Sequence, residues 1–209
     1  MPTPIIRLAT TEDAAAVAAI YAPFCRDDSH VSFEIGAPPP GEMALRIAST
    51  LEHRPWLVCE GAGEVLGYVY AGPHNERAAY RWSVTVAVYV APGRRGTGVG
   101  RGLYESLFAA LRVQGYVNAY AGVVLPNPGS IALHRSVGFT PVGIYREIGY
   151  KCGAWQSSSW WELALRDRPE RPEPPLSLAE ARARPDWPEA LAIGLRFLKP
   201  PPLGEEILG

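Results

Sequence analysis

The stretch VAPGRRGTGVGRGLYESLFAAL, residues 90–111, decides the fold of this chain. A β-branched and aromatic segment leads into it, and its second half has the apolar spacing of an amphipathic helix over residues 98–114. Strand, glycine-rich turn and helix in this order bring backbone N–H groups and the positive end of the helix to one place. We therefore predict a local site for a pyrophosphate-sized anion, to which Arg94, Arg95 and Arg101 can add charge.

Two better-known phosphate loops fit these glycines poorly. A dinucleotide-binding fingerprint needs G-x-G-x-x-G and an acidic residue about 20 positions later, whereas residues 96–100 read G-x-G-x-G with no suitable acid near residue 120. A Walker loop ends in Gly-Lys-Ser or Gly-Lys-Thr, and this chain has Gly100, Arg101 and Gly102 there. A plain tight turn without a ligand stays open as the alternative.

The composition is that of an ordinary globular protein and argues against some partners. Of 209 residues 47% are hydrophobic and 20% charged, and the formal net charge of −1 gives no overall attraction to nucleic acid or an anionic membrane. No apolar run is long enough to cross a membrane, and the first ten residues do not resemble a signal peptide. Cys25, Cys59 and Cys152 lack any metal-ligand spacing, so we expect no metal site, free thiols and a cytoplasmic protein.

Hydrophobic periodicity and turn signals predict a mixed α/β sheet rather than a repeating βαβ barrel. Strands are expected at 5–9, 56–60, 64–72, 80–90 and 117–125, followed by two final strands around a CGAW turn at 152–155. Helices are expected at 10–25, 42–53, 98–114 and 127–138.

The composition changes after residue 166, which divides the chain into a body, 1–166, and an extension, 167–209. Nine of the 21 prolines fall in the last 44 residues, a density that excludes regular sheet and one continuous helix. Within the extension, WPEALAIGLRFL, residues 187–198, carries an apolar stripe. We expect this segment to form a helical clip on the body or on a partner subunit, and a disordered tail without function is the alternative.

At this point the chain resembles a known superfamily. The pattern Arg95-x-x-Gly98-x-Gly100 after VAVYVAP looks like the acyl-CoA pyrophosphate motif of the GCN5-related N-acetyltransferases, and NPGSIALHRSVGF at 127–139 resembles their second signature. More narrowly, VSFEIGAPPP, AGPHNERAAYRW and GIYREIGYKCGAW are similar to phosphinothricin and methionine sulfoximine N-acetyltransferases. The resemblance covers residues 4–166. It implies a mostly antiparallel central sheet with one splayed parallel strand pair, helices on both faces, and a homodimer.

The resemblance also implies a site for acetyl-CoA as co-substrate. In that family the co-substrate lies where two parallel strands splay, so the backbone of Val88, Tyr89 and Val90 would hold the pantetheine arm and thioester. The pyrophosphate would be wrapped by the loop Arg95, Gly96, Thr97, Gly98, Val99 and Gly100. Asn127 matches a side chain that binds pantetheine. His134 matches the position facing the departing thiolate, where it either protonates the sulfur or only contacts the co-substrate.

The acceptor pocket implied by the resemblance takes residues from three parts of the chain, and for each an ordinary structural role is the alternative. Arg77 is the natural clamp for a carboxylate or phosphinate, because a guanidinium binds such groups bidentately. The other expected lining residues are Phe33, Glu34, Tyr80, Tyr150, Lys151 and Trp155.

One position departs from the family pattern. The family carries a Thr-Val-Glu sequence in the long strand, with the Glu acting through water as general base, whereas this chain reads Ser83-Val84-Thr85. Threonine is no base near neutral pH, and a positioned base is worth about 10² to 10⁴ in rate. Glu34 is a candidate replacement base, and the alternatives are an acceptor amine with a low pKa or bulk water as the proton acceptor.

The sequence thus predicts an N-acetyltransferase that passes an acetyl group directly from acetyl-CoA to the amine of a small amino-acid-like molecule. The alternative is an acyl-CoA-binding module with weak or redirected catalysis, for which Thr85 is the main support.

Overall fold

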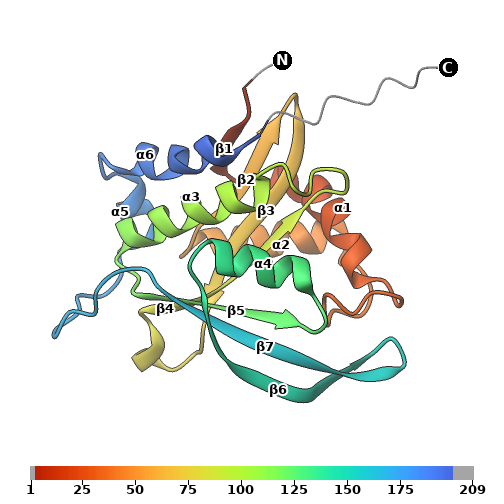
Figure 1. Cartoon of the computed structure of the whole chain (residues 1–209). Helices are drawn as coiled ribbons and strands as arrows, with labels where there is room; N and C mark the ends of the chain where they lie inside the picture. Colours follow the sequence, from red (N-terminus) through yellow and green to blue (C-terminus); the bar gives the residue numbers. More distant parts are fainter. Residues whose placement is uncertain (1–2, 200–209) are drawn as a thin grey trace.

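The computed structural model describes residues 3–199 and is built around one seven-stranded sheet (Figure 1). The strand order across the sheet is β1-β2-β3-β4-β5-β7-β6. The strands are β1 (Ile5–Leu8), β2 (Trp56–Gly61), β3 (Glu64–Pro73), β4 (Ser83–Val90), β5 (Asn118–Val124), β6 (Thr140–Lys151) and β7 (Ala154–Ala164).

Neighbouring strands run antiparallel at every step across the sheet except one. Only β4 and β5 are parallel, and the helix between them makes the crossover that a parallel pair requires. The predicted mixed and mostly antiparallel sheet with a single parallel pair is therefore confirmed.

Helices cover both faces of the sheet, as predicted. One face packs α1 (Ala14–Cys25) and α2 (Pro40–Leu51) against Trp56, Val58 and Tyr68. On the opposite face, the leucines of α3 (Val99–Gln114) pack against the core of the sheet, and α4 (Pro128–Ser136) lies beside it. Within the described part of the chain, none of these helices has the length and hydrophobicity that a membrane crossing requires.

The long strand is shorter than the sequence suggested. A strand was expected from Tyr80, but β4 begins at Ser83, and Ala78–Tyr80 form a short 3-10 turn. The reason lies in the partner strand, because β3 ends at Pro73, which pairs with Val84, and proline has no N–H with which to continue a ladder. The carbonyl of Trp82 still accepts hydrogen bonds from Val117 and Asn118 at the start of β5, and the residues before Trp82 form a separate loop.

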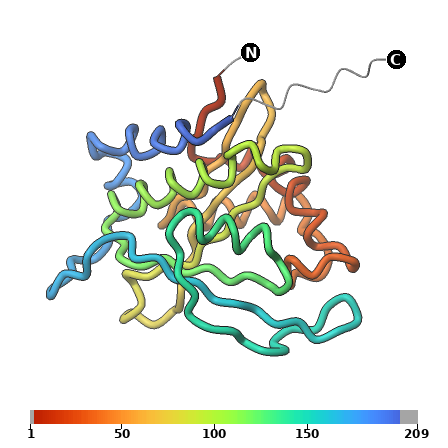
Figure 2. Tube along the Cα trace, in the orientation of Figure 1, coloured from red at the N-terminus to blue at the C-terminus, as the bar shows by residue number. Residues whose placement is uncertain are grey.

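The C-terminal extension folds back along α3 (Figures 1 and 2). It contains α5 (Leu178–Arg182), α6 (Trp187–Ala192) and a 3-10 turn, Ile193–Phe197. Trp187 is buried in a cluster with Ala110 of α3, while Ser106 of α3 donates a hydrogen bond to the carbonyl of Leu191 at 2.7 Å. The segment 187–197 thus packs on the body of the same chain. Residues 200–209 of the predicted extension lie outside the described residues, and its division from the body at residue 166 stays a prediction.

Candidate functional site

The parallel strands β4 and β5 stay together for only three residue pairs. Ser83 pairs with Asn118, Val84 with Ala119 and Thr85 with Tyr120, and beyond Thr85 the two strands part. The rest of β4 remains paired with β3 on its other side, as far as Val90. One edge of residues 86–90 therefore faces a gap. The N–H of Ala91 donates to Leu66 of β3, so by alternation the main-chain groups of Tyr89 also pair with β3, while those of Val88 and Val90 face the gap and can pair with an extended ligand.

The glycine loop follows β4 directly and ends at the start of α3. Gly93, Gly96 and Gly98 have φ of 79°, 77° and 84°, a left-handed conformation that glycine adopts without strain. Gly98 is the N-cap of α3, and no side chain caps the first turn. The first amides of α3, from Val99 and Gly100, are therefore free of a side-chain cap, and the helix dipole favours an anion there. The C-terminal extension packs against Gly98 through the backbone of Phe197, and the pyrophosphate site at this positive helix end stays a prediction.

The three arginines around this loop have different surroundings. Arg94 approaches Glu64 at 3.5 Å, and Arg101 lies near Glu105 at 3.8 Å and over the ring of Phe197. The guanidinium of Arg95 lies 5.5 Å from the ring centre of Phe24, at the end of α1. Arg95, the residue of the predicted motif, is therefore placed between the loop and α1.

The predicted residues of α4 are both engaged inside the protein. Asn127 is the N-cap of α4, and its Oδ1 accepts a hydrogen bond from the backbone N–H of Ser130 at 3.1 Å. His134 is buried, with Nδ1 2.7 Å from the carbonyl of Ser130 and Nε2 2.9 Å from the hydroxyl of Tyr104. Burial lowers the pKa of His134, which favours a neutral ring that donates from Nδ1 and accepts at Nε2. Roles of both residues toward acetyl-CoA stay predictions.

Glu34 lies in the loop between α1 and α2 and is paired with a cation. Its two carboxylate oxygens accept from Arg46 at 2.6 and 2.9 Å, and Tyr21 donates to it at 3.2 Å. The hydrogen bonds from Arg46 hold the pKa of Glu34 below its usual value. A carboxylate held in this way is a weak base, so the geometry favours an anchoring role for Glu34.

Lys151 also holds the α1–α2 loop. Its buried Nζ donates to the carbonyls of Ser32 at 2.8 Å and Glu34 at 2.9 Å, which joins the loop to the end of β6. Phe33 of the same loop packs on Gly149, where a Cβ would meet its ring at 2.7 Å. On the β6–β7 hairpin Tyr150 and Trp155 are exposed and in edge-to-face contact. The structure thus joins the α1–α2 loop to the end of β6, with Lys151 holding the loop, and the role of these residues in binding a substrate stays a prediction.

A histidine that the sequence reasoning passed over lies beside Thr85. His74 follows β3, and its Nδ1 is 3.2 Å from Thr85 Oγ1. Its ring stacks on Tyr120 at 4.3 Å between ring centres, and Tyr80 and Trp160 also lie against it. The antiparallel register that puts Gly72 opposite Thr85 brings His74 to this point, so a strand-pairing argument could have found it. Arg77, the predicted anion clamp, is exposed in the same loop.

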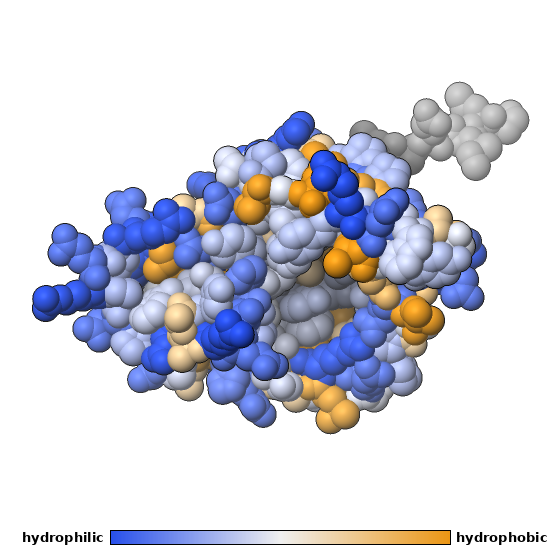
Figure 3. Space-filling view, turned by 90° about the horizontal axis from the view of Figure 1, so that it is seen from below, coloured by the Kyte–Doolittle hydropathy of each residue, from blue (hydrophilic) through white to orange (hydrophobic). Residues whose placement is uncertain are grey.

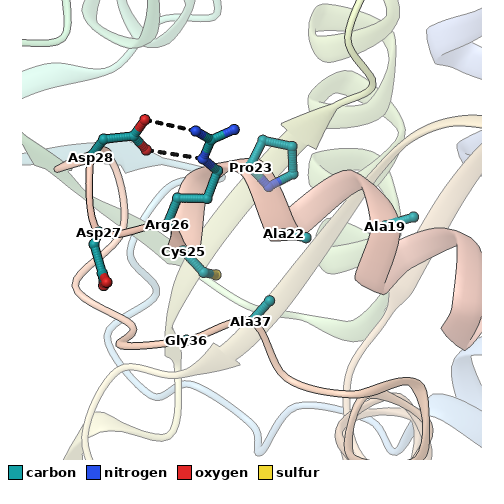
Figure 4. Close-up of a pocket in the computed structure, with 9 residues that line it drawn as sticks. All are labelled: Ala19, Ala22, Pro23, Cys25, Arg26, Asp27, Asp28, Gly36 and Ala37. Carbon is teal, nitrogen blue, oxygen red and sulfur yellow. Dashed lines mark hydrogen bonds and ion pairs between the residues drawn. The ribbon is translucent and has the colours of Figure 1, made fainter.

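Three pockets lie around α1 in the described part of the chain, and the one beside Arg7 and Asp13 contains none of the predicted site residues. One, of about 510 Å³, is bounded by Tyr21, Glu34, Arg46, Tyr70 and Gly72, the residue that pairs with Thr85. A second, of about 670 Å³, lies at the end of α1, where small side chains and the exposed Arg26–Asp28 ion pair line it (Figure 4). Figure 3 shows that the face seen from below, on the side of the β6–β7 hairpin, is hollowed. Of these three pockets, only the one that includes Gly72 adjoins the end of the parallel pair.

Comparison with known proteins identifies the family. A family model described as an acetyltransferase (GNAT) domain matches residues 6–160. The chain belongs to the GNAT acetyltransferase family. It is an acetyl-CoA-dependent acyltransferase, as the sequence motifs predicted.

Relatives and solved structures agree with this assignment. The chain is 37% identical to a phosphinothricin N-acetyltransferase of Streptomyces viridochromogenes over 171 residues, which cover 80% of this chain and 93% of the relative. It is 32% identical to an L-methionine sulfoximine/L-methionine sulfone acetyltransferase of Salmonella typhimurium, covering 77% and 94%. A phosphinothricin acetyltransferase from Sinorhizobium meliloti, solved in complex with acetyl-CoA, superposes with a TM-score of 0.75 at 29% identity, covering 85% of this chain and 99% of that one. The resemblance to this branch is therefore confirmed.

Proposed function

We propose that the protein acetylates the primary amine of a small amino-acid-like substrate of the phosphinothricin or methionine sulfoximine type. The observation that carries the proposal is the gap between β4 and β5, which opens directly beside Thr85 and leads to the uncapped start of α3. The gap suits a thioester at one end and a pyrophosphate at the other. The names of the relatives supply the acceptor class.

Direct transfer depends mostly on how the chain positions the amine and the thioester. Main-chain N–H groups at an unpaired strand edge can hydrogen-bond the thioester carbonyl and stabilise the negative charge that develops on its oxygen. Among the acceptor residues, Arg77 is proposed to bind the carboxylate or phosphinate of the substrate from its loop beside η2 (Ala78–Tyr80).

The test is an assay of thiol release and product mass with acetyl-CoA and a panel of amines. The panel contains phosphinothricin, methionine sulfoximine, methionine sulfone, common L-amino acids and a polyamine. We expect acetylated product from at least one of the α-amino acids and none from the polyamine. Turnover of the polyamine alone would refute the acceptor class.

A matched pair of variants tests the anion clamp. Arg77→Gln should raise the KM for the amino acid by about 10- to 100-fold, the value of a lost charge-assisted pair, with little change in the KM for acetyl-CoA. Arg81→Gln, an exposed arginine four residues away, should behave as the wild type. Equal effects of the two substitutions would contradict the clamp.

A second candidate function is an acyl-CoA-binding protein with weak or redirected catalysis. The observation in its favour is that Thr85 replaces a base and that Glu34 is paired with Arg46. It predicts a large thermal shift with acetyl-CoA but no product with any amine. Thr85→Glu should then raise the turnover of methionine sulfoximine. A wild-type protein that acetylates an amine efficiently would refute this second candidate function.

We also propose a homodimer formed through the β6–β7 hairpin. β6 is an edge strand, and large apolar side chains on the hairpin are each more than half exposed, a pattern typical of an interface. These side chains are Val142, Ile144, Tyr145, Ile148, Tyr150 and Trp155. Ile144→Glu should reduce the mass in solution to that of a monomer, while Ile5→Glu on the opposite edge strand should not.

A cytoplasmic location is likewise proposed, supported by three free cysteines.

A further inference from the structure

Acetyl transfer to an amine needs a proton acceptor that the familiar site residues of this chain do not provide. An ammonium group must lose a proton before its nitrogen can attack a thioester. Thr85 stands where the family carries a glutamate, and a threonine hydroxyl does not accept a proton at neutral pH. Glu34 is held by two hydrogen bonds from Arg46. If a side chain rather than bulk water accepts the proton, it therefore comes from another element.

His74 has the position that such a base requires. Thr85 and Tyr120 form the last pair of the parallel ladder, so they mark the point at which β4 and β5 part. The His74 ring is stacked on Tyr120 and hydrogen-bonded through Nδ1 to Thr85 Oγ1, which fixes the ring in two directions at that point. Within residues 3–199 no protein group hydrogen-bonds Nε2, so this nitrogen is available to a substrate.

We propose that His74 is the general base of the acetyl transfer and that Thr85 is its positioning residue. The proposal rests on the proposed function, because it needs an amine as acceptor. His74, directly after β3 and hydrogen-bonded to Thr85 of β4, would accept the proton that the single glutamate accepts in the family pattern. When Nδ1–H donates to Thr85 Oγ1, Nε2 carries the lone pair that accepts the proton.

The proton balance is complete without any further reactant. Nε2 of His74 takes one proton from the substrate ammonium group and passes it to solvent. The amine nitrogen then forms a bond to the thioester carbonyl carbon, and the bond between that carbon and sulfur breaks. The second proton leaves the nitrogen and ends on the CoA thiolate, so the products are the acetylated amine, CoA thiol and one released proton.

The surroundings of His74 favour its neutral form. Burial among aromatic rings lowers the pKa of His74, which makes the imidazole a free base at neutral pH. The titratable groups around it are Tyr80 of the 3-10 turn, Tyr120 of β5 and, opposite Tyr120 in the register, Glu162 of β7. Glu76 and Arg77 follow it in its own loop. We therefore expect kcat/KM to fall on the acid side as His74 gains its proton.

The variants are chosen to separate a catalytic from a structural role. His74→Gln should lower kcat by about 10² to 10⁴-fold and remove the acid limb of the pH profile, with the KM for acetyl-CoA nearly unchanged. Thr85→Val should lower kcat by about tenfold and shift the acid limb, and Thr85→Ser should restore both. Thr85→Glu in the His74→Gln background should recover at least part of the lost rate. His53→Gln, at the end of α2, is the control that should match the wild type.

A second measurement does not depend on the acceptor. The chain has four histidines, and the ring proton signal that disappears in His74→Gln can be followed by NMR titration in the wild type. We expect His74 to be neutral at pH 7.5 and its titration to shift in Thr85→Val. If the amino acids of the panel fail and another amine is acetylated, the acceptor class is wrong and the variants are assayed with that amine.

Two results would overturn the proposal. One is a His74→Gln enzyme that keeps its kcat and its acid limb while its thermal shift with acetyl-CoA is that of the wild type. The other is an NMR titration in which His74 is still charged at pH 7.5, since an imidazolium cannot accept a proton.

Discussion

Replacing Gly194 with alanine tests how closely the C-terminal extension packs against α3. A Cβ on Gly194 would lie 2.5 Å from Ser106 Oγ and would collide with the main-chain carbonyl of Gly102. The extension would have to move away from α3. The backbone N–H of Gly194 donates to Ser106 Oγ at 3.1 Å, and Ser106 Oγ donates to the carbonyl of Leu191 at 2.7 Å, so both bonds would weaken or break.

The size of the effect follows from these contacts. Overpacking of a well-packed site costs about 1–3 kcal/mol, and each lost hydrogen bond costs about 1 kcal/mol. If both bonds break, we expect the free energy of unfolding to fall by about 3–5 kcal/mol, which lowers Tm by about 6–20 °C for a chain of this length. If the extension detaches instead, the loss cannot exceed the stability that its docking contributes, and residues 187–199 become accessible to protease.

Urea unfolding and limited proteolysis with mass analysis measure both outcomes. Gly41→Ala is the matched control, because Gly41 is also helical but a Cβ there would meet nothing within 4 Å. This control should be unchanged or more stable by up to about 1 kcal/mol, the helix propensity of alanine over glycine. A Gly194→Ala protein that unfolds like the wild type and keeps its extension protected would refute the reasoning.

Three further predictions follow from the site and its surroundings. A chain ending at Arg166 should bind acetyl-CoA about tenfold more weakly, as measured by calorimetry. It loses the extension, in which the backbone N–H of Lys199 donates to the carbonyl of Thr97 in the glycine loop at 2.8 Å. Unchanged affinity would contradict this prediction. Glu34→Gln should lower kcat by less than about tenfold without moving the pH profile, since Arg46 already neutralises the carboxylate, whereas loss of the base would cost about 10² or more. Burial lowers the pKa of His134 in the folded state, so below about pH 6.5 this histidine takes up a proton more readily in the unfolded chain. The free energy of unfolding should therefore fall as the pH decreases toward about 5.5. Urea titrations of His134→Gln should show a weaker dependence of this free energy on pH.

The order of elements in the body and the glycine loop before α3 could be predicted from the sequence alone. Both depend on local patterns: the alternation of a strand, the spacing of leucines on α3 and glycines at 96 and 98, which have positive φ. The same local logic placed the turn between β6 and β7, where Cys152 and Gly153 have φ of 55° and 72°. It failed at the start of β4, because a strand begins only where its partner can pair with it.

The chemistry beside the gap was decided by the tertiary structure. His74 and Thr85 are 11 positions apart and meet because β3 and β4 pair in one register, while Glu34 meets Arg46 because α2 packs beside the preceding loop. The sequence predicted Lys151 as a residue of the acceptor pocket. In the fold it lies at the end of β6, and its Nζ donates to the carbonyl of Ser32 in the loop between α1 and α2. The sequence determined which elements form and that a glycine loop leads into α3, since those depend on neighbours in the chain. Which side chains neutralise, hold or orient one another depends on contacts between distant segments, and only the folded sheet sets those.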